Sequence, residues 1–276
     1  ALPLSKRVLR ALIHRPKLDP ELRIKALNHL AEQGSKTKEQ TLIEIIGQLE
    51  REEHPALDDW LAVLDSTQVS SSGLLDSLLK LKNSTIRQAA FAGQLRSGHL
   101  TSIPLDPDAL RSIARIDSPK LKLSYLEPAQ KALSLSGAVQ DAALFSLGHI
   151  PGNDTKIFAV LAKHVVNPDL TASAVEAILT RPEETWPAEA AAALLDTQLP
   201  ILKSTPVEKR GSASFELASK LLTIISTIRK AHDTVAQIRS LQLVPVEVAT
   251  VPDQLRFDQN SIRVPANTPV ELRLNN

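Results

Sequence analysis

The sequence predicts a mostly α-helical protein, an α-solenoid of stacked helix pairs over residues 1–242 followed by a short β segment over residues 243–276. Apolar side chains recur every three or four positions up to Leu243, a spacing that places them on one face of an α-helix. Polar residues able to cap a helix stand before several of these stripes. Beyond Leu243 the apolar spacing becomes two, which is typical of half-buried strands.

Proline, glycine and capping residues divide the helical region into segments. The DPE at 19–21 supplies an N-cap, a proline at the first helical position and a carboxylate for the helix dipole, and Gly34 is expected to end that helix. The DPD at 106–108 repeats this order, and Pro200 and Pro206 are expected to break later helices. We expect helices over 2–13, 22–33, 37–52, 57–64, 74–81, 85–96, 121–126, 136–147, 157–166, 167–178, 188–195 and 212–239, the last with a break near His232.

Four of the predicted helix openings share one pattern: DPELRIKALNHL from Asp19, NSTIRQAAFAGQ from Asn83, SGAVQDAALFSL from Ser136 and NPDLTASAVEAI from Asn167. Each has a polar cap first, an aliphatic residue at the fourth place and alanine at the eighth: Ala26, Ala90, Ala143 and Ala174. A small residue in the middle of a helix lets a neighbouring helix approach closely. The pattern resembles the second helix of HEAT or armadillo units, although the openings are 64, 53 and 31 residues apart and follow no strict period.

The tail beyond Leu243 alternates apolar and polar residues in three stretches: Val244, Val246 and Val248; Ile262 and Val264; and Val270, Leu272 and Leu274. Turns are expected at 258–260 and 265–269. Two or three strands cannot bury both faces of a sheet, so these would be the first strands of a β-sandwich. Either a continuation of the chain supplies the remaining strands, or the tail packs on the helices.

The stretch LRFDQNSIRVPANTPVELRLNN, about 22 residues long, resembles the opening of a cupredoxin domain. The resemblance is carried by Leu255, Phe257, Ile262, Val264, Ala266, Pro269, Val270, Leu272 and Asn275. Asn267 stands where glycine is usual, and asparagine also accepts the left-handed backbone conformation.

Together with the helical repeats, the Trp186-Pro187 pair and the long apolar helix, the tail is similar to one class of large secreted proteins of planctomycetes and verrucomicrobia, labelled membrane-bound dehydrogenases. In that family a sorbosone-dehydrogenase-like propeller precedes HEAT repeats, with cupredoxin-like and c-type haem domains elsewhere in the chain. The resemblance implies a periplasmic or secreted location and an electron-transfer context, with copper and haem c in other parts of a parent protein. The tail itself has no His, Cys or Met, the ligands of type 1 copper, so no cofactor is expected in this chain.

Composition narrows the remaining classes of function. Charged residues make up 23% of the chain and the net charge is +1, which gives no electrostatic footprint for nucleic acid or an anionic membrane. No apolar run approaches the roughly 18 residues that span a bilayer. The 276 residues include no cysteine, which excludes disulfides and thiolate chemistry. Methionine is also absent and the chain begins with Ala1, so we expect a piece of a longer polypeptide or a sequence from which modified methionines are missing; any signal peptide would lie upstream.

The groups that could carry chemistry form no recognisable constellation. Seven histidines, at 14, 29, 54, 99, 149, 164 and 232, show no metal-ligand spacing. His149 and His164 could approach each other in a folded helix pair, but surface or capping roles are favoured. Asp58 and Asp59 beside Trp60 are compatible with the pocket of a helical-repeat DNA glycosylase, but a first-turn acidic pair beside a core tryptophan is favoured.

Other patterns are expected to be structural. The charged runs at 6–7 and 50–53 are interpreted as solvated faces. Gly148 and Gly152 do not form a phosphate loop, because no Lys-Ser/Thr follows them, and no Ser-His-Asp set has the context of a nucleophile elbow. No catalytic, cofactor-binding or metal-ligating residue is therefore predicted.

The sequence thus favours a structural and interaction segment, not an enzyme, that docks another domain of the same polypeptide or a separate protein. By the resemblance, it would position a dehydrogenase-like propeller against cupredoxin and haem domains. The alternative is a free-standing HEAT-repeat module that binds protein, with the strand tail as a docked edge. A helical-repeat nucleic-acid enzyme is disfavoured by the near-neutral charge.

Overall fold

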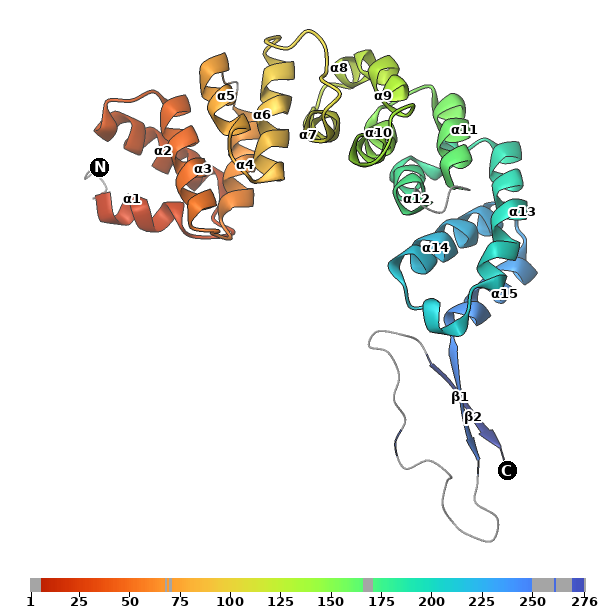
Figure 1. Ribbon diagram of the computed structural model, residues 1–276. Helices are drawn as coiled ribbons and strands as arrows, with labels where there is room; N and C mark the ends of the chain where they lie inside the picture. The colour runs from red at the N-terminus through yellow and green to blue at the C-terminus, as the bar shows by residue number, and fades with distance from the viewer. Residues whose placement is uncertain are drawn as a thin grey trace. The chain divides into compact units, whose positions relative to one another are not determined.

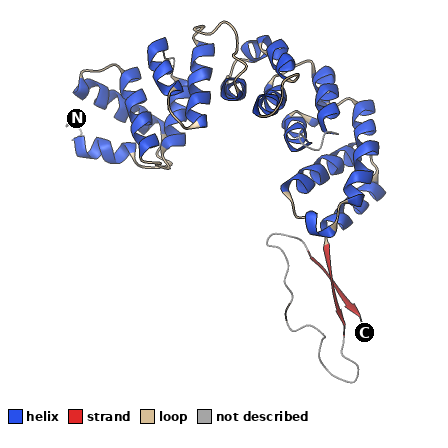
Figure 2. Cartoon of the chain, in the orientation of Figure 1, coloured by secondary structure: helices blue, strands red, loops and turns tan. Residues whose placement is uncertain are grey.

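The computed structural model describes residues 6–67, 69, 71–165, 171–249, 261 and 270–275, and this part of the chain is mostly helical (Figures 1 and 2). The chain divides into two compact units, Ala1–Gly152 and Asn153–Asn276. The domain boundary predicted at 242/243 lies inside the second unit, where the last helix gives way to the first strand. None of the described helices is both long and apolar enough to cross a membrane.

The first unit is a succession of helices that pack mainly on their neighbours in the chain. Its elements are α1 (Lys6–Ile13), α2 (Pro20–Gly34), α3 (Lys38–Arg51), α4 (Leu57–Ser66), α5 (Ser72–Leu79), α6 (Ser84–Arg96), α7 (Pro107–Arg111), the 3₁₀ helix η1 (Ser112–Arg115), α8 (Pro119–Ser124), α9 (Leu126–Ala132) and α10 (Ala138–His149). Helix α6 packs against α4, α5 and α7, and α10 packs against α7 and α9. Most of these helices therefore bury their apolar residues against helices that lie near them in the chain.

The second unit follows the same local pattern. Its elements are α11 (Asp154–Val165), α12 (Thr171–Thr180), the 3₁₀ helix η2 (Glu183–Thr185), α13 (Ala188–Ser204), the 3₁₀ helix η3 (Val207–Lys209), α14 (Ala213–Ile228), α15 (His232–Gln242), β1 (Val244–Ala249) and β2 (Val270–Asn275). Helix α14 packs against α12, α13 and α15. The break predicted near His232 is confirmed, because α14 ends at Ile228 and α15 begins at His232.

Several predicted helix starts are confirmed by capping hydrogen bonds, but the cap predicted at Ser136 is wrong, because Gly137 stands at the N-cap position of α10 and no side chain caps that helix. The Asp19 carboxylate accepts from the backbone N–H groups of Glu21 and Leu22, and Asn83, Asp106 and Ser118 cap α6, α7 and α8 in the same way. Thr37 and Gln40 form a capping box at the start of α3. Such caps satisfy N–H groups that the helix itself cannot pair.

Two predicted helix ends are wrong, and the end predicted at Gly34 is confirmed to within one residue. Gly34 is the last residue of α2, and Ser35 instead takes the left-handed conformation, with φ 51°. Gly148 is buried inside α10, which continues to His149 and so passes the predicted end at 147. Pro200 lies within α13, which continues to Ser204. At Gly148 and Pro200 the helix continues past a residue whose intrinsic preference is against it.

The four alanines that share the eighth place of the repeated openings are all buried: Ala26 in α2, Ala90 in α6, Ala143 in α10 and Ala174 in α12. Leu22, predicted to be buried, is 45% exposed, and its neighbour Arg23 is only 1% exposed. Arg23 is buried in place of Leu22 because it turns inward to form an ion pair with Asp59 of α4. The helix face predicted from apolar residues alone is therefore rotated at the start of α2.

The strands β1 and β2 are parallel, with Val244 opposite Val270 and Val248 opposite Leu274. Val248 is 4% exposed, whereas Leu272 is 54% exposed. The strand predicted at 262–264, the turns predicted at 258–260 and 265–269, and residues 167–170 of the opening at Asn167 lie outside the described residues. Parallel strands require a crossover connection, so β1 and β2 do not form a hairpin.

Candidate functional site

Ion pairs link the starts of helices that lie near each other, and Arg23 of α2 is the most buried example. Its Nη2 lies 2.6 Å from Asp59 Oδ2 in the first turn of α4, and it also donates to the carbonyl of Arg15 at 3.0 Å. Burial lowers the pKa of Arg23, and the Asp59 charge opposes that shift. The guanidinium also lies over the Trp60 ring, 5.6 Å from its centroid. The Arg23 guanidinium therefore joins α2 to α4.

A second linkage surrounds Asp108 in the first turn of α7. Its carboxylate accepts from Ser84, from Arg87 Nε at 2.7 Å and from Gln88 at 3.3 Å, all on α6. Burial alone raises the pKa of Asp108, but these three hydrogen bonds and the Arg87 charge outweigh burial and lower it. The carboxylate is therefore held in its ionised form between α6 and α7.

Two further pairs repeat the arrangement. Arg111 of α7 pairs with Asp141 in the first turn of α10, and Arg181, after α12, pairs with Asp154 in the first turn of α11. An aspartate in the first turn also interacts favourably with the positive end of the helix dipole. These charges therefore join helix to helix within each unit.

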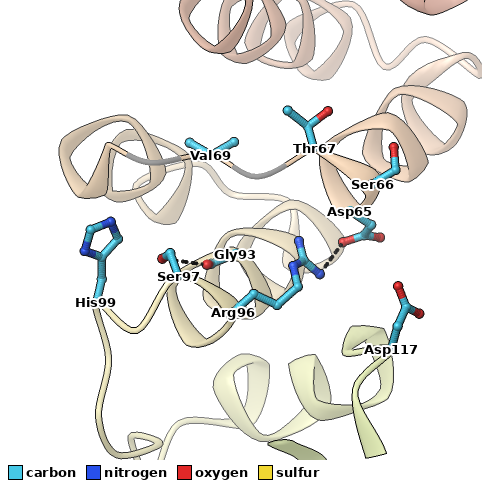
Figure 3. A pocket seen from close by; sticks show the side chains of 9 residues that line it. All are labelled: Asp65, Ser66, Thr67, Val69, Gly93, Arg96, Ser97, His99 and Asp117. Atoms are coloured by element: carbon cyan, nitrogen blue, oxygen red, sulfur yellow. Dashed lines mark hydrogen bonds and ion pairs between the residues drawn. The ribbon is translucent and has the colours of Figure 1, made fainter.

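A cavity of about 640 Å³ opens where α4 and α6 end in the first unit (Figure 3). Its lining consists of Asp65, Ser66, Thr67, Val69, Gly93, Arg96, Ser97, His99 and Asp117. Pockets that bind small ligands or side chains occupy roughly 300–1,000 Å³. In the view of Figure 3, Asp65 and Asp117 lie at one end of the cavity and His99 lies at the other.

The two arginines beside the cavity are turned to Asp65. Arg115 Nη2 lies 2.6 Å from Asp65 Oδ2, and Arg96 Nη1 lies 3.5 Å from Asp65 Oδ1 and 3.1 Å from the Arg115 carbonyl. The Asp65 charge is therefore compensated. Asp117 is exposed, and no hydrogen bond or ion pair to its carboxylate is found in the part of the chain that the structure describes.

The hydroxyl groups of the cavity all donate to carbonyls at helix ends. Ser66 Oγ and Thr67 Oγ1 donate to the Val63 carbonyl at 2.9 and 2.7 Å, and Ser97 Oγ donates to the Gly93 carbonyl at 2.9 Å. Because each hydroxyl proton is used in this way, the oxygens are left with lone pairs that can accept. Val69, 4% exposed, and Gly93 supply an apolar floor.

The residues singled out from the sequence are mostly placed as predicted. Asp58 and Asp59 lie in the first turn of α4, and Trp60 is 0% exposed, with Nε1 donating to the Ile13 carbonyl at 3.0 Å. A tryptophan buried in this way has no free face for a base. His149 belongs to the first unit, where its Nδ1 lies 2.9 Å from the Phe145 carbonyl, and His164 belongs to the second. The disfavoured alternative of a metal shared by these two histidines is not tested.

The run at 50–53 is largely exposed, as predicted, but two of its carboxylates are paired. Glu50 accepts from the backbone N–H groups of Lys82 and Asn83 at 3.1 and 3.3 Å, and so holds the loop before α6. Glu52 Oε2 lies 2.8 Å from His14 Nε2, and hydrogen bonds from Gln48 and then His14 lower the pKa of Glu52. The sequence carried no signal for these contacts, because the partners are more than thirty positions apart.

Among the described residues, no group of three or more His, Cys, Asp or Glu side chains is placed to hold a metal ion. Comparison with known proteins gives no match to any family model, curated protein or solved structure. Function is therefore inferred from the chemistry of the cavity and from the linkages between helices.

Proposed function

We propose that this chain is a non-catalytic scaffold of HEAT- or armadillo-like helix pairs that belongs to a multidomain extracytoplasmic redox protein. In that role it positions a dehydrogenase-like propeller against cupredoxin and c-type haem domains. The observation that carries the scaffold role is the linkage from helix to helix: buried alanines at one repeated place, with arginine–aspartate pairs between neighbouring helices. A stack held by nearest-neighbour contacts presents an extended face suited to docking another domain.

The tail supports the second part of the proposal. The two described strands leave apolar side chains uncovered, with Val270 38% and Leu272 54% exposed. A two-stranded sheet gains stability when further strands or a packed layer cover such a face. That is the behaviour expected of strands that open a larger β domain.

The residues of this chain do not fit a copper centre. Residues 243–276 include no His, Cys or Met, and type 1 copper requires imidazole and thiolate ligands. Copper and haem would be bound by other parts of the parent protein. The sequence that follows Asn276 in the intact polypeptide tests this directly, since a Pro-His-Asn-like motif there would supply the first copper ligand.

The decisive experiment removes residues 1–242 in frame from the parent protein. Electron transfer from the propeller to the haem, followed by absorbance, is expected to slow strongly while both domains keep their own spectra and folding. Transfer at an unchanged rate would show that the helices do not position the domains.

The free-standing binding module is the second candidate, and the same exposed strand residues favour it. An edge strand with open backbone groups can pair with a strand of another protein. This reading predicts that the chain, expressed with its natural ends, captures a partner that is lost when Leu272 is replaced by lysine. Recovery of the same partner by both forms would exclude the strand edge as the docking element.

A further inference from the structure

We propose that a groove between α13 and α14 binds the C-terminal residue of another polypeptide, with its apolar side chain in the groove and its carboxylate at the start of α14. This inference rests on the proposed scaffold role and names what one docking point of the scaffold recognises. The groove lies within the second unit and has a volume of about 280 Å³. That volume is close to the lower end of the range for ligand pockets, so it suits one or two residues better than a long segment.

The walls of the groove are apolar. Side chains of three helices form them: Val165 of α11, Ile201 and Leu202 of α13, and Phe215 and Ala218 of α14. Leu202 and Phe215 are almost fully buried, whereas Ile201 is 53% exposed. An apolar side chain that enters the groove covers Ile201 and removes both surfaces from water. The walls therefore favour an aliphatic group as the part of the ligand that enters.

The groove also reaches the start of α14, where several hydrogen-bond donors meet. Lys209 lines this part, is exposed and has no ion-pair partner among the described residues. Ser212 and Ser214 line it as well, and the backbone N–H groups of Ala213 and Ser214 have no acceptor in the part of the chain that the structure describes. The positive end of the helix dipole adds to the Lys209 charge. A carboxylate fits this combination of an ammonium and free N–H groups.

The charge balance around the groove is positive. Residues 201–218 contain three cations and two carboxylates: Lys203, Lys209 and Arg210 against Glu208 and Glu216. Neither glutamate lines the groove. The charged side chain that a ligand meets there is therefore the ammonium of Lys209.

A second observation, at Gln198, points to a ligand that also carries a carbonyl oxygen. Gln198 lines the groove and is only 7% exposed, and its Nε2 has no hydrogen-bond partner among the described residues. A buried amide without a partner is unfavourable, and a half-turn about its last side-chain bond turns the N–H groups to the groove. Gln198 lies about two helical turns before Thr205, where α13 ends. The peptide carbonyl that precedes a C-terminal residue supplies the acceptor, whereas the one polar group of a fatty acid is already bound at the start of α14.

The test is a titration of the full ¹⁵N-labelled chain, followed by NMR, with acetyl-Gly-Leu, whose carboxylate is free. Saturable shifts are expected at the amides of Ser214, Phe215 and Ala218, and the same peptide with a C-terminal amide should give none. Ile201→Asp should abolish the shifts, because it places a negative charge in the apolar wall. Ile228→Asp, the same change at an isoleucine that is 51% exposed and lies outside the groove, should leave binding unchanged.

Two further variants test the polar contacts. Lys209→Gln should weaken binding by about five-fold, the upper end for an exposed charge pair. Gln198→Leu should weaken it by about three- to ten-fold, because one neutral hydrogen bond to the ligand is lost. Leucine has nearly the same size and removes a buried amide, so the urea midpoint of Gln198→Leu should not fall below that of the wild-type chain. Unchanged binding in both variants would contradict the proposed orientation of the ligand.

Hexanoate distinguishes the two sources of an aliphatic carboxylate. Weaker binding of hexanoate than of acetyl-Gly-Leu supports a polypeptide C-terminus, and equal binding overturns that assignment in favour of a free fatty acid. Equal shifts with the peptide amide, or an unchanged affinity in Ile201→Asp, overturn the site itself. Neither result bears on electron transfer after removal of residues 1–242, so failure of the site and failure of the scaffold role are distinguishable.

Discussion

At the scale of single residues, charge is used mainly to join helices. Asp59, Asp108 and Asp141 each lie in the first turn of a helix and pair with an arginine of another helix. The ionised form of each aspartate is stabilised both by the arginine and by the helix dipole. Forming the pair partly desolvates the arginine. Removing one partner of such a pair leaves the other charge partly desolvated and without its counter-charge.

Asp108→Asn tests this cost. The substitution keeps the shape of the side chain but removes the charge that accepts from Ser84, Arg87 and Gln88. We expect the free energy of unfolding to fall by about 2–4 kcal/mol at pH 7, measured by urea denaturation. Asp117→Asn is the control, and because Asp117 is exposed its substitution should change stability by less than about 0.5 kcal/mol.

The pH dependence of that difference has a defined sign. The pKa of Asp108 is lower in the folded chain than its ordinary value of 3.8. Its contribution to stability is therefore fully present above the unfolded pKa and is lost as the pH falls through the folded pKa. The stability difference between the wild-type chain and Asp108→Asn should stay constant from pH 7 to about pH 5 and shrink towards pH 3. A difference that grows on acidification would contradict this account of Asp108.

At the scale of elements, two glycines within helices have opposite surroundings. A Cβ at Gly93 of α6 would lie 3.0 Å from Leu75 Cδ2, whereas at Gly47 of α3 the nearest atom would be Arg51 Nη1 at 3.7 Å. Leu75 is 0% exposed and has little room to move. Gly93 thus permits the close approach of α5 to α6, and Gly47 has no comparable role.

Alanine substitutions at the two glycines should therefore change the free energy of unfolding in opposite directions. Gly47→Ala should stabilise the chain by about 0.5–1 kcal/mol, the helix propensity gained over glycine. Gly93→Ala gains the same propensity, but overpacking costs about 1–3 kcal/mol, so a net loss is expected. Urea midpoints of the two variants measure this directly. Stabilisation of equal size by both would show that Leu75 gives way freely.

Pro200 offers a test within α13. Proline has no N–H, so the Asp196 carbonyl lacks its donor from the next turn, and the ring is exposed and adds little to the core. Pro200→Ala should raise the free energy of unfolding by about 1–2 kcal/mol, because the restored hydrogen bond exceeds the entropy that proline removes from the unfolded chain. Pro206→Ala, outside the helix, should instead be neutral or slightly destabilising. Loss of stability in Pro200→Ala would mean that the helix geometry imposed by proline is needed for packing.

These elements show which features can be predicted from residues that are close together in the sequence, and which cannot. The caps at Asp19, Asn83 and Asp106 were predictable because a cap depends on residues two or three positions away. The stop at Pro200 was wrong because helix packing outweighed the local cost. The cavity was not predictable, because Asp65 and Arg115 are fifty positions apart and each looks like an ordinary surface charge in the sequence.

At the scale of the whole molecule, each of the two units has an apolar core of its own. Trp60, Leu61 and Leu75 belong to the core of Ala1–Gly152, and Phe158 and Trp186, with ring centroids 5.7 Å apart, belong to that of Asn153–Asn276. A chain whose stability comes from neighbouring helices can also be divided at a loop without removing most of the contacts on either side. Gly152, in the loop between α10 and α11, has φ 74°, a conformation that suits glycine.

We therefore expect a chain of residues 1–152 to fold by itself. Its far-ultraviolet circular dichroism should be that of a helical protein, and urea should unfold it in one cooperative transition with a slope smaller than that of the full chain, because less surface is exposed. Asp108→Asn should destabilise this shorter chain by as much as it destabilises the full one, since all its partners lie on α6. The control is Phe158→Ala in the full chain, which should lower the stability of the second unit and leave the transition of the first unchanged. A single shared transition that Phe158→Ala shifts as a whole would show that the two units unfold together.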